Sequence, residues 1–310
     1  MSIAFGPLSY GAAPLGNLYR EVSVEQAHDA LQATWDAGIR YFDTAPHYGL
    51  GLSERRLGAF LRGKPRDEFV VSTKVGRLLV PNPDDDGSGD LDRVFKVPGD
   101  LMRRFDMTEA GIRRSLDESL ERLGLDRVDI VYLHDPDVYD IDRGLREGLP
   151  ALAALRDEGL VREVGVGTNS TAAAARAVRE GDLDLVLIAG RYTLLEQPAL
   201  DELFPVCAKG GVRVVSAAPF NSGLLATNEL PADARYDYVS APRAVLDRVR
   251  ELAGVCASFG VELPAAALQF PGRNPVVATT LVGMASPDEV RQNVQRVSAT
   301  IPDGLWEALD

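Results

Sequence analysis

Short apolar runs alternate with amphipathic stretches along almost the whole chain. The earlier runs carry β-branched or aromatic residues and contain no proline, which is typical of buried strands. The predicted strands are Leu8–Gly11, Arg40–Asp43, Phe69–Lys74, Asp129–His134, Glu163–Gly167, Leu185–Ala189, Val212–Ala217 and Val277–Val282.

The stretches between these runs have helical periodicity. In Thr108–Leu123 the apolar residues recur every three or four positions, and Ser23 and Gln26 have the spacing of a capping box. A glycine follows each predicted helix closely, and glycine favours the left-handed conformation that ends a helix. The predicted helices are Ser23–Asp36, Thr108–Leu123, Gly144–Glu158, Thr171–Glu180 and Pro198–Lys209, with Gly38, Gly124, Gly159, Gly181 and Gly210 as their stops.

Eight strand–helix alternations in 310 residues favour a parallel sheet closed into a (β/α)₈ barrel, the TIM-barrel fold. An open doubly wound sheet is the alternative. Its nucleotide-binding form carries G-x-G-x-x-G after an early strand, and neither Gly49-Leu50-Gly51 nor Gly165-Val166-Gly167 completes that pattern. We find no linker or low-complexity tract, so residues 1–310 are predicted to form a single domain.

Two connections are too long to be simple turns. Val75–Met107 and Pro219–Pro242 each follow a strand, so both are placed at the C-terminal rim, where barrel enzymes have their active sites. Loops of this length are usually functional or disordered, and we expect lids or substrate walls. The run Asp84-Asp85-Asp86 is interpreted as a solvated loop tip and not as a metal site.

Composition and charge exclude several classes of partner. A net charge of −13 argues against a nucleic-acid binder, which needs a basic face, and against binding to an anionic membrane.

The N-terminal residues lack a signal-peptide pattern, and no apolar run approaches the roughly 20 residues of a membrane span. Two cysteines, Cys207 and Cys256, are too few for a disulfide framework or a four-cysteine zinc site, so we expect reduced thiols in a cytoplasmic protein.

Polar residues close three of the apolar strands. Asp43, Lys74 and His134 end predicted strands, and Tyr48 follows Asp43 in the next loop. Each has a structural explanation when taken alone, but together they place a carboxylate, a phenol, an ammonium and an imidazole at one rim. No G-x-S-x-G, H-x-H or H-E-x-x-H motif points to a hydrolase or to a zinc site, and no metal ligand set is predicted.

This set of groups suits proton transfer. Tyrosine has an ordinary pKa of about 10, and a nearby ammonium such as Lys74 favours the tyrosinate. Asp43 would keep Lys74 charged and oriented. His134 would hold a substrate oxygen between itself and Tyr48.

The sequence resembles the aldo-keto reductases over essentially its whole length. The run from Gly38 to Gly58, GIRYFDTAPHYGLGLSERRLG, is similar to the signature of that family, and STK at Lys74, LHD at His134 and GVGTN at Asn169 match further motifs. The resemblance implies a (β/α)₈ barrel that moves hydride between C4 of a nicotinamide cofactor and a carbonyl or alcohol carbon. It implies Tyr48 as general acid/base, Asp43 and Lys74 as its tuning pair, and His134 as substrate orienter.

The resemblance also implies which residues contact the cofactor. Thr168 and Asn169 would hold the carboxamide. Many family members carry a glutamine on the sixth strand, where this chain reads Leu187-Ile188-Ala189-Gly190, and a tyrosine after the seventh, where it reads Ser216-Ala217-Ala218-Pro219-Phe220. Further contacts are expected from the loops after the last two strands, at Ala217, Pro219, Gly223, Leu225, Gly283, Ser286, Glu289, Gln292 and Asn293.

The helix after the last strand indicates which dinucleotide is used. Ser286 and Glu289 have capping-box spacing around Pro287. NADPH-dependent relatives place Lys and Arg near Gly283 and Glu289, whereas this chain has no positive charge there. A carboxylate repels a 2′-phosphate and accepts a hydrogen bond from a 2′-hydroxyl, so NAD is predicted, with NADP as the alternative.

The phrases AGRYTLLEQ and SAAPFNSGLL resemble the sugar dehydrogenases of this family that act on L-fucose and related D-threo-aldoses; pyridoxal dehydrogenases are also similar. The main hypothesis is oxidation of an aldose to its lactone, with substrate contacts at Tyr19, His47 and Phe220. The alternatives are a pyridoxal or general aldehyde or ketone oxidoreductase, and a non-catalytic nicotinamide-binding redox-sensor subunit. The predicted protein is a monomer or homodimer whose partner is a small sugar or aldehyde.

Overall fold

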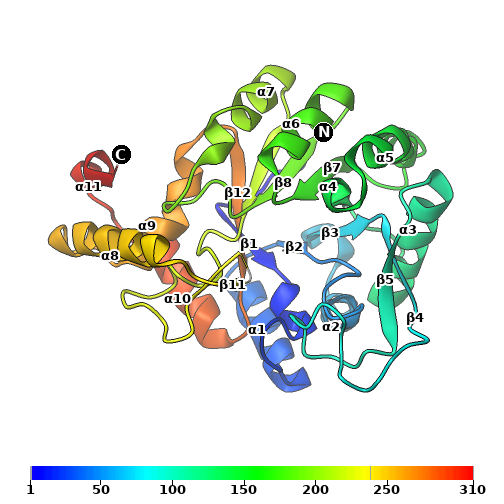
Figure 1. Cartoon of the computed structure of the whole chain (residues 1–310), viewed down its shortest axis with the longest axis horizontal. Coiled ribbons are helices and arrows are strands. Elements are labelled where there is room, and N and C mark those ends of the chain that lie inside the picture. The colour runs from blue at the N-terminus through cyan, green and yellow to red at the C-terminus, as the bar shows by residue number, and fades with distance from the viewer. Residues whose placement is uncertain (1, 238, 310) are drawn as a thin grey trace.

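Eight parallel strands form a closed barrel in the computed structural model, which describes residues 2–237 and 239–309 (Figure 1). The strands follow the order β1-β12-β9-β8-β7-β6-β3-β2 around the barrel. Their bounds are β1 Leu8–Gly11, β2 Tyr41–Asp43, β3 Val70–Val75, β6 Ile130–His134, β7 Glu163–Thr168, β8 Leu185–Ala189, β9 Arg213–Ala217 and β12 Val277–Gly283. The closed order confirms the predicted barrel, and the open doubly wound alternative is wrong.

The strand register explains why chemically active residues meet at one rim. Asp43 pairs with Ser72 of β3, two residues before Lys74, and His134 pairs with Gly167 of β7. Because all eight strands are parallel, their carboxyl ends open on the same side.

Helices surround the barrel (Figure 1). Their bounds are α1 Val24–Asp36, α2 Leu52–Leu61, α3 Glu109–Leu123, α4 Pro136–Tyr139, α5 Ile141–Asp157, α6 Thr171–Glu180, α7 Leu203–Gly210, α8 Arg243–Ser258, α9 Leu263–Gln269, α10 Pro287–Val297 and α11 Asp303–Leu309; short 3₁₀ turns are η1 Ala13–Gly16, η2 Arg66–Glu68, η3 Pro198–Leu200 and η4 Phe270–Arg273. The predicted caps of the first helices are confirmed, since Ser23 accepts from the Gln26 N–H and Gly124 is left-handed after α3.

Two helix predictions are wrong in part. The helix predicted from Gly144 begins at Ile141, because Asp140 caps it by accepting from the Arg143 N–H. The helix predicted at Pro198–Lys209 is divided into η3 and α7. A continuous helix would place Pro205 in its interior, where its ring clashes with a preceding carbonyl; in α7 it lies in the first turn, which tolerates proline.

Two of the predicted glycine stops also differ. Gly210 is the last residue of α7, and the left-handed residue is Gly211, with φ of 68°. Gly181 ends α6 in an extended conformation, with φ of −120°.

The two long connections contain secondary structure. Val75–Met107 includes the antiparallel pair β4 Arg77–Pro81 and β5 Leu101–Phe105, and Pro219–Pro242 includes β10 Arg235–Tyr236 and β11 Val239–Ser240. Asp85 and Asp86 accept hydrogen bonds from backbone N–H groups two residues on and lie on an exposed turn. The interpretation of this run as a loop tip is consistent with those contacts.

Two hydrophobic clusters fill the molecule. A small one lies inside the barrel around Tyr41, Tyr132 and Leu185 and includes Ile3, whose N–H is bound by Glu163. The larger one fills the space between barrel and helices, and Cys207 lies in it. Both Cys207 and Cys256 are free, as predicted. Both are also buried, and burial raises their thiol pKa values to about 12 and about 11.

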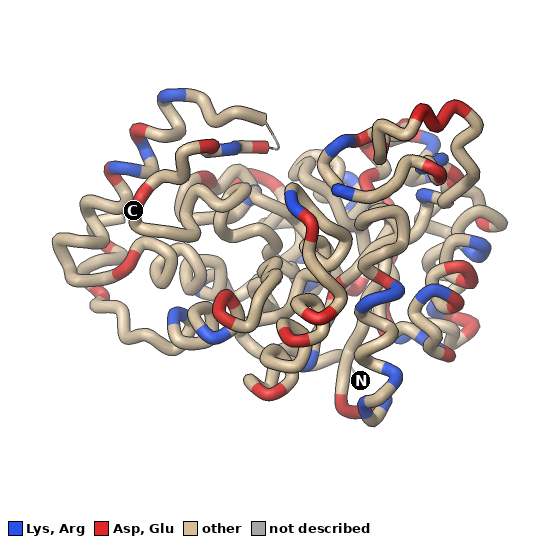
Figure 2. The backbone as a smooth tube through the Cα atoms, turned by 90° about the horizontal axis from the view of Figure 1, so that it is seen from below, with Lys and Arg blue, Asp and Glu red and all other residues tan. Residues whose placement is uncertain are grey.

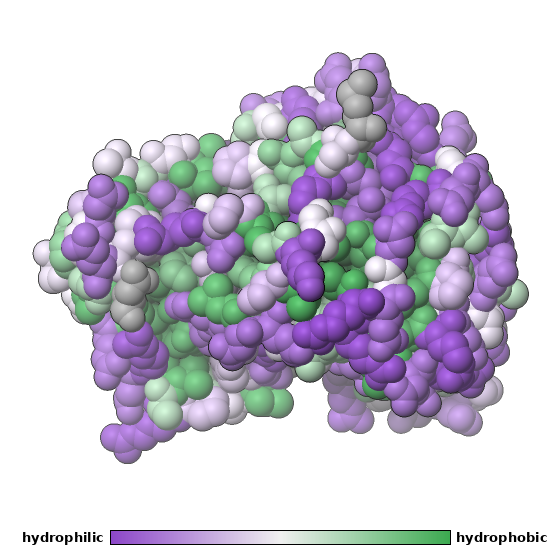
Figure 3. Space-filling model, turned by 90° about the horizontal axis from the view of Figure 1, so that it is seen from above, coloured by the Kyte–Doolittle hydropathy of each residue, from purple (hydrophilic) through white to green (hydrophobic). Residues whose placement is uncertain are grey.

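Charges are mixed over the outside of the molecule. Basic residues lie among acidic ones along the outer segments (Figure 2), and the surface seen in Figure 3 is mostly hydrophilic with smaller hydrophobic areas between. Within the described residues no single helix has the length and apolar composition to cross a membrane, although the bent pair Arg243–Ser258 and Leu263–Arg273 meets these criteria jointly.

Gly58 provides a test of the packing between α2 and α3. A Cβ at Gly58 would lie 2.0 Å from the Leu123 carbonyl oxygen, and both elements are fixed against the barrel. We expect Gly58→Ala to lower the free energy of unfolding by about 1–3 kcal/mol in urea titrations. Gly254→Ala in α8 is the control: nothing lies within 4 Å of its Cβ, and alanine should raise helix stability by about 0.5–1 kcal/mol. Equal unfolding free energies for the two variants would contradict this packing.

Candidate active site

The strand ends surround a cavity of about 900 Å³ at the C-terminal mouth of the barrel. Asp43, Tyr48, Lys74 and His134 all line it, so the four residues predicted as a proton-transfer set lie at one place. The volume is at the upper end of the range for small-molecule sites.

Lys74 is the centre of this group. Its ammonium nitrogen lies 2.6 Å from Asp43 Oδ2, 3.0 Å from the Thr44 carbonyl oxygen and 3.0 Å from the Tyr48 hydroxyl oxygen. The three donors of the ammonium therefore have three oxygen acceptors. The Lys74 and Asp43 side chains are each only 2% exposed.

Burial acts to lower the pKa of Lys74, but the charge of Asp43 and the contact with Tyr48 outweigh it, and the pKa is raised above its ordinary value. The second oxygen of Asp43 accepts from the Ser72 hydroxyl at 2.7 Å. Lys74 is therefore held charged, with one proton directed at the Tyr48 oxygen, and this hydrogen bond stabilises the phenolate.

The loop that carries Tyr48 is pressed against η1. A Cβ at Gly49, which has φ of +61°, would lie 2.3 Å from the Gly16 carbonyl oxygen. Only glycine fits such a contact in the left-handed region, so the backbone beside Tyr48 is fixed by this crossing.

Two neutral histidines flank Tyr48. Burial and then nearby cations, Arg77 among them, hold the pKa of His134 well below 6.5; burial and then Arg103 and Arg77 do the same for His47. The His134 ring stands edge-on to Tyr48 with 6.2 Å between centroids. His134 Nδ1 is buried and has no partner among the described residues.

Arg77 fixes the tautomer of His47. One guanidinium nitrogen lies 3.3 Å from His47 Nδ1, and the other forms a close ion pair with Asp135. Arginine only donates, so Nδ1 must accept and the proton must be on Nε2. Burial raises the pKa of Asp135 to about 6, against the lowering effect of Arg77.

The loop between β4 and β5 lines one side of the cavity through Asp92, Val94 and Phe95. Phe95 packs against His47 and Tyr48, with centroid distances of 5.3 and 6.1 Å. The Tyr19 N–H donates to the Val94 carbonyl at 2.7 Å, which ties this loop to the loop after β1. The sequence analysis predicted a substrate wall here but missed Phe95, because one aromatic residue in a long loop gives no periodic signal.

Most predicted contact residues line the cavity. All three predicted substrate residues line it, namely Tyr19, His47 and Phe220. The predicted cofactor residues that line it are Thr168, Asn169, Ala217, Pro219, Gly223, Gly283 and Glu289. Leu225, Ser286, Gln292 and Asn293 are outside this lining, and Leu225 is fully buried in the core.

The Thr168 hydroxyl, predicted to contact the carboxamide, has partners within the protein. It donates to Asp137 at 2.6 Å and accepts from the Ser170 N–H at 3.0 Å. The Thr168 hydroxyl proton is therefore already used in a hydrogen bond within the protein. Asn169, the other residue predicted to hold the carboxamide, also lines the cavity.

Ala285 and Glu289, at the start of α10, line the cavity, and this part is called its far end below. Ser286 caps the helix by accepting from the Glu289 N–H at 3.3 Å. The Glu289 carboxylate reaches back to the Ala285 N–H at 2.7 Å, one residue before the cap, and forms a 3.0 Å ion pair with Arg20. The predicted capping function is present in this modified form.

The donor set and the shape of the cavity fit a nicotinamide cofactor with a small substrate. Part of the wall is formed by the small residues Gly167, Ala189, Ala217 and Ala218. They leave room for a flat ring beside Asp43, Tyr48, Lys74 and His134, which are called the tetrad below. A Cβ at Gly167 would lie 3.6 Å from Lys74 Cε, so this wall borders the tetrad directly.

The neutral state of His134 couples stability to pH. Below about pH 6.5 the unfolded chain binds a proton at this histidine that the folded chain does not bind. The free energy of unfolding therefore decreases as the pH falls below 6.5, by up to about 1.4 kcal/mol per pH unit. The raised pKa of Asp135 has the opposite effect, because it favours the folded chain as the pH falls. This effect is present in the wild type and in both histidine variants. We expect the unfolding free energy of His134→Gln, measured in urea between pH 7 and 5.5, to fall less steeply than that of the wild type.

The control for this measurement is His28→Gln, since the His28 side chain is 60% exposed and lies outside the site. It should keep the wild-type slope. Parallel slopes for His134→Gln and the wild type would contradict the burial of a neutral imidazole.

Comparison with known proteins identifies the family. Residues 7–310 match the model of the aldo/keto reductase family. A D-threo-aldose 1-dehydrogenase from Pseudomonas sp is 54% identical over 308 residues, covering 99% of this chain and 94% of the relative, and a pyridoxal 4-dehydrogenase from Microbacterium luteolum is 39% identical, covering 97% and 92%. The structure of an aldo-keto reductase from Bacillus halodurans has a TM-score of 0.75 and 25% identity, covering 98% of this chain and 90% of that one. The chain therefore belongs to the aldo/keto reductase family and is an oxidoreductase of the kind that works with a nicotinamide cofactor.

Proposed function

We propose that the protein is an NAD-dependent aldose 1-dehydrogenase that oxidises the cyclic hemiacetal of a sugar to its lactone. The observation that carries the proposal is the 3.0 Å hydrogen bond from the Lys74 ammonium to the Tyr48 hydroxyl on the wall of the cavity. The 54% identity to a D-threo-aldose 1-dehydrogenase supports an aldose as substrate.

The reaction removes a hydride from C1 and a proton from its hydroxyl, and a carbon–oxygen double bond forms. A bound nicotinamide ring supplies the hydride acceptor at C4. Tyr48 takes the hydroxyl proton, and Lys74 stabilises the phenolate that receives it. Neutral His134 holds the same substrate oxygen by a hydrogen bond and so fixes it beside Tyr48.

The lining of the cavity suits an uncharged polyol. Aromatic faces at Tyr19, Phe95 and Phe220 can pack against a sugar ring, and the carboxylates Asp92 and Asp135 accept hydrogen bonds from hydroxyl groups. The described lining residues carry five carboxylates, at Asp43, Asp92, Asp135, Asp137 and Glu289, against two cations, at Arg20 and Lys74. This balance disfavours a phosphorylated sugar.

Pyridoxal is the second candidate substrate. The 39% identity to a pyridoxal 4-dehydrogenase favours it, and aromatic walls also suit a flat pyridine ring. Initial rates of NAD⁺ reduction with a panel of aldoses, L-fucose included, and with pyridoxal separate the two. The proposal predicts a D-threo-aldose as the best substrate by kcat/KM, and a clear preference for pyridoxal would overturn it.

The choice of NAD follows from the charges at the far end of the cavity. Arg20 is the cation there, and Glu289 already pairs with it. A 2′-phosphate would have to compete with the Glu289 carboxylate, whereas a 2′-hydroxyl can donate to it.

Tyr48→Phe tests the proton-transfer role. Without the phenolic oxygen we expect kcat for aldose oxidation to fall by about 10²–10⁴-fold, because general acid–base groups contribute about that much. NAD⁺ affinity, measured by protein fluorescence, should remain. Tyr139→Phe is the matched control: its ring stacks on Phe105 outside the cavity lining, so turnover should be unchanged. Near-normal kcat in Tyr48→Phe would exclude this role.

Glu289→Gln tests the cofactor preference. The amide keeps an acceptor for the Ala285 N–H, removes the negative charge and releases Arg20. We expect the NAD⁺ to NADP⁺ ratio of kcat/KM to fall by about tenfold, since a charged hydrogen-bond partner is exchanged. Asp288→Asn is the control, because Asp288 pairs with Arg291 outside the cavity lining. An unchanged ratio in Glu289→Gln would mean that Glu289 only caps α10.

A further inference from the structure

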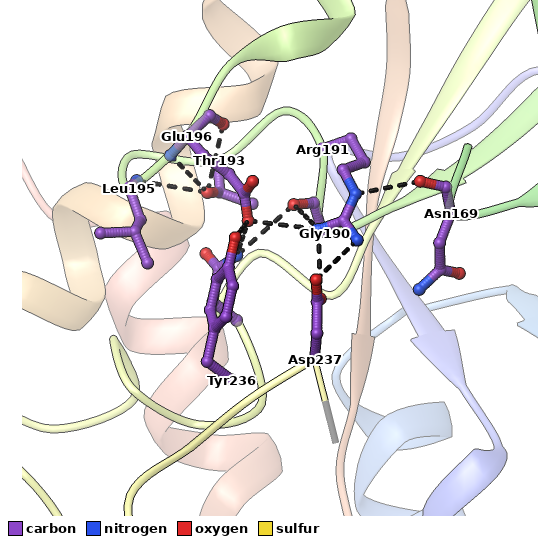
Figure 4. Close-up of polar contacts among 9 residues, drawn as sticks. Asn169, Gly190, Arg191, Thr193, Leu195, Glu196, Tyr236 and Asp237 are labelled. Carbon is purple, nitrogen blue, oxygen red and sulfur yellow. Dashed lines mark hydrogen bonds and ion pairs between the residues drawn. The ribbon is translucent and has the colours of Figure 1, made fainter. Parts of the chain in front are cut away.

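A polar cluster outside the tetrad joins three segments of the rim (Figure 4). Arg191, just after β8, forms a double ion pair with Asp237, at 2.8 and 3.1 Å, and contacts Glu196 at 3.3 Å. Glu196 Oε1 also accepts from the Tyr236 hydroxyl and from Asn221 Nδ2, each at 2.9 Å. One carboxylate oxygen therefore collects donors from the loop after β8 and from two parts of the loop after β9.

Glu196 is itself fixed by a local turn. Its N–H donates to the Thr193 hydroxyl at 3.2 Å, and its carbonyl accepts from the Thr193 N–H at 2.8 Å (Figure 4). The Arg191 and Glu196 side chains are only 18% and 21% exposed. The Arg191–Glu196 pair is therefore half-buried and held by the local turn.

The cluster holds both walls of the predicted cofactor site. Arg191 Nε donates to the Asn169 carbonyl at 2.9 Å, and Asn169 lines the cavity. Asn221 also lines it, and its amide is held through Nδ2, which donates to Glu196 and, more weakly at 3.4 Å, to the Gly190 carbonyl. Its Oδ1 has no partner among the described residues.

The loop that Asn221 anchors is strained. Ala218 and Ser222 have φ of 55° and 58°, in the left-handed region that costs a residue with a Cβ about 1–2 kcal/mol, and Asn221 has φ of 43°, which asparagine adopts at a lower cost. All three line the cavity, next to Pro219 and Gly223, two of the predicted cofactor contacts. Such a conformation persists only where its surroundings enforce it. The Asn221–Glu196 hydrogen bond is a side-chain contact that can do so.

We propose that Glu196, braced by Arg191, is a positioning residue for the nicotinamide cofactor: through the Asn221 amide it holds the strained loop 218–223 in its cofactor-binding conformation. The inference rests on the proposed function. Asn221 serves in it as an anchor for the loop, through its Nδ2.

Asn221 itself offers the sharpest test. Asn221→Ala and Asn221→Gly both lose the amide, but only glycine adopts a positive φ without cost. We expect the dissociation constant of NADH, measured by fluorescence titration, to rise about five- to thirtyfold in Asn221→Ala, the range that corresponds to 1–2 kcal/mol, and to rise less in Asn221→Gly. Equal weakening in the two variants, or none in either, would overturn the proposal.

Glu196→Ala should weaken NADH binding by a similar factor, and Asn221→Gly added to it should restore most of the loss, although the double variant lacks both side chains. A double variant that binds NADH no better than Glu196→Ala would contradict the anchoring role.

Glu163→Ala is the matched control. Glu163 also accepts from an arginine, Arg213, and from a backbone N–H, but at the other end of the barrel. It should lower the melting temperature without changing NADH affinity. Wild-type protein that does not bind NADH would contradict the proposed function instead.

Discussion

The buried ion pair between Lys74 and Asp43 is the constraint on which the rest of the site depends. An ammonium taken out of water costs several kcal/mol unless it is paired and hydrogen-bonded, and here every donor has an acceptor. That requirement fixes the lysine against β2 and directs its remaining proton at Tyr48. The arrangement that makes the ion pair tolerable is thus the same one that activates the phenol. Removing one partner alone would leave an uncompensated buried charge, at a cost of about 3–5 kcal/mol.

The electrostatics of the site extend outward from this pair. Burial and neighbouring cations keep His134 and His47 neutral, so both are available as hydrogen-bonding groups at neutral pH. Arg77 links His47 to Asp135 and sets the tautomer of His47. The site therefore combines the Lys74–Asp43 and Arg77–Asp135 ion pairs with two neutral imidazoles, which fits a reaction in which a proton and a hydride leave an uncharged substrate.

The tetrad and the barrel were predictable because their signals are periodic or local. Asp43, Lys74 and His134 each end an apolar run, and parallel strands bring such ends to one rim. The helix predicted at Pro198–Lys209 is divided between η3 and α7, and Pro205 is the residue in that stretch that signals the division. The Arg191–Glu196 cluster could not be predicted, since it joins residues up to 68 positions apart in irregular loops whose spacing carries no pattern. Contacts of this kind depend on tertiary packing, and Thr168 shows the same limit: its partner Asp137 is set by the fold and not by the GVGTN motif.

The central claim is that Lys74 makes Tyr48 the proton acceptor in aldose oxidation. It is tested most directly by the pH profile of kcat/KM for NAD⁺ reduction in the double variant Asp43→Asn/Lys74→Met, which removes the ion pair without leaving a buried charge. Without the ammonium the phenolate is harder to form, so the acid limb of the profile should move to higher pH by about 1–3 units, with NAD⁺ affinity retained. An acid limb at the wild-type position in a folded, active double variant would contradict the account.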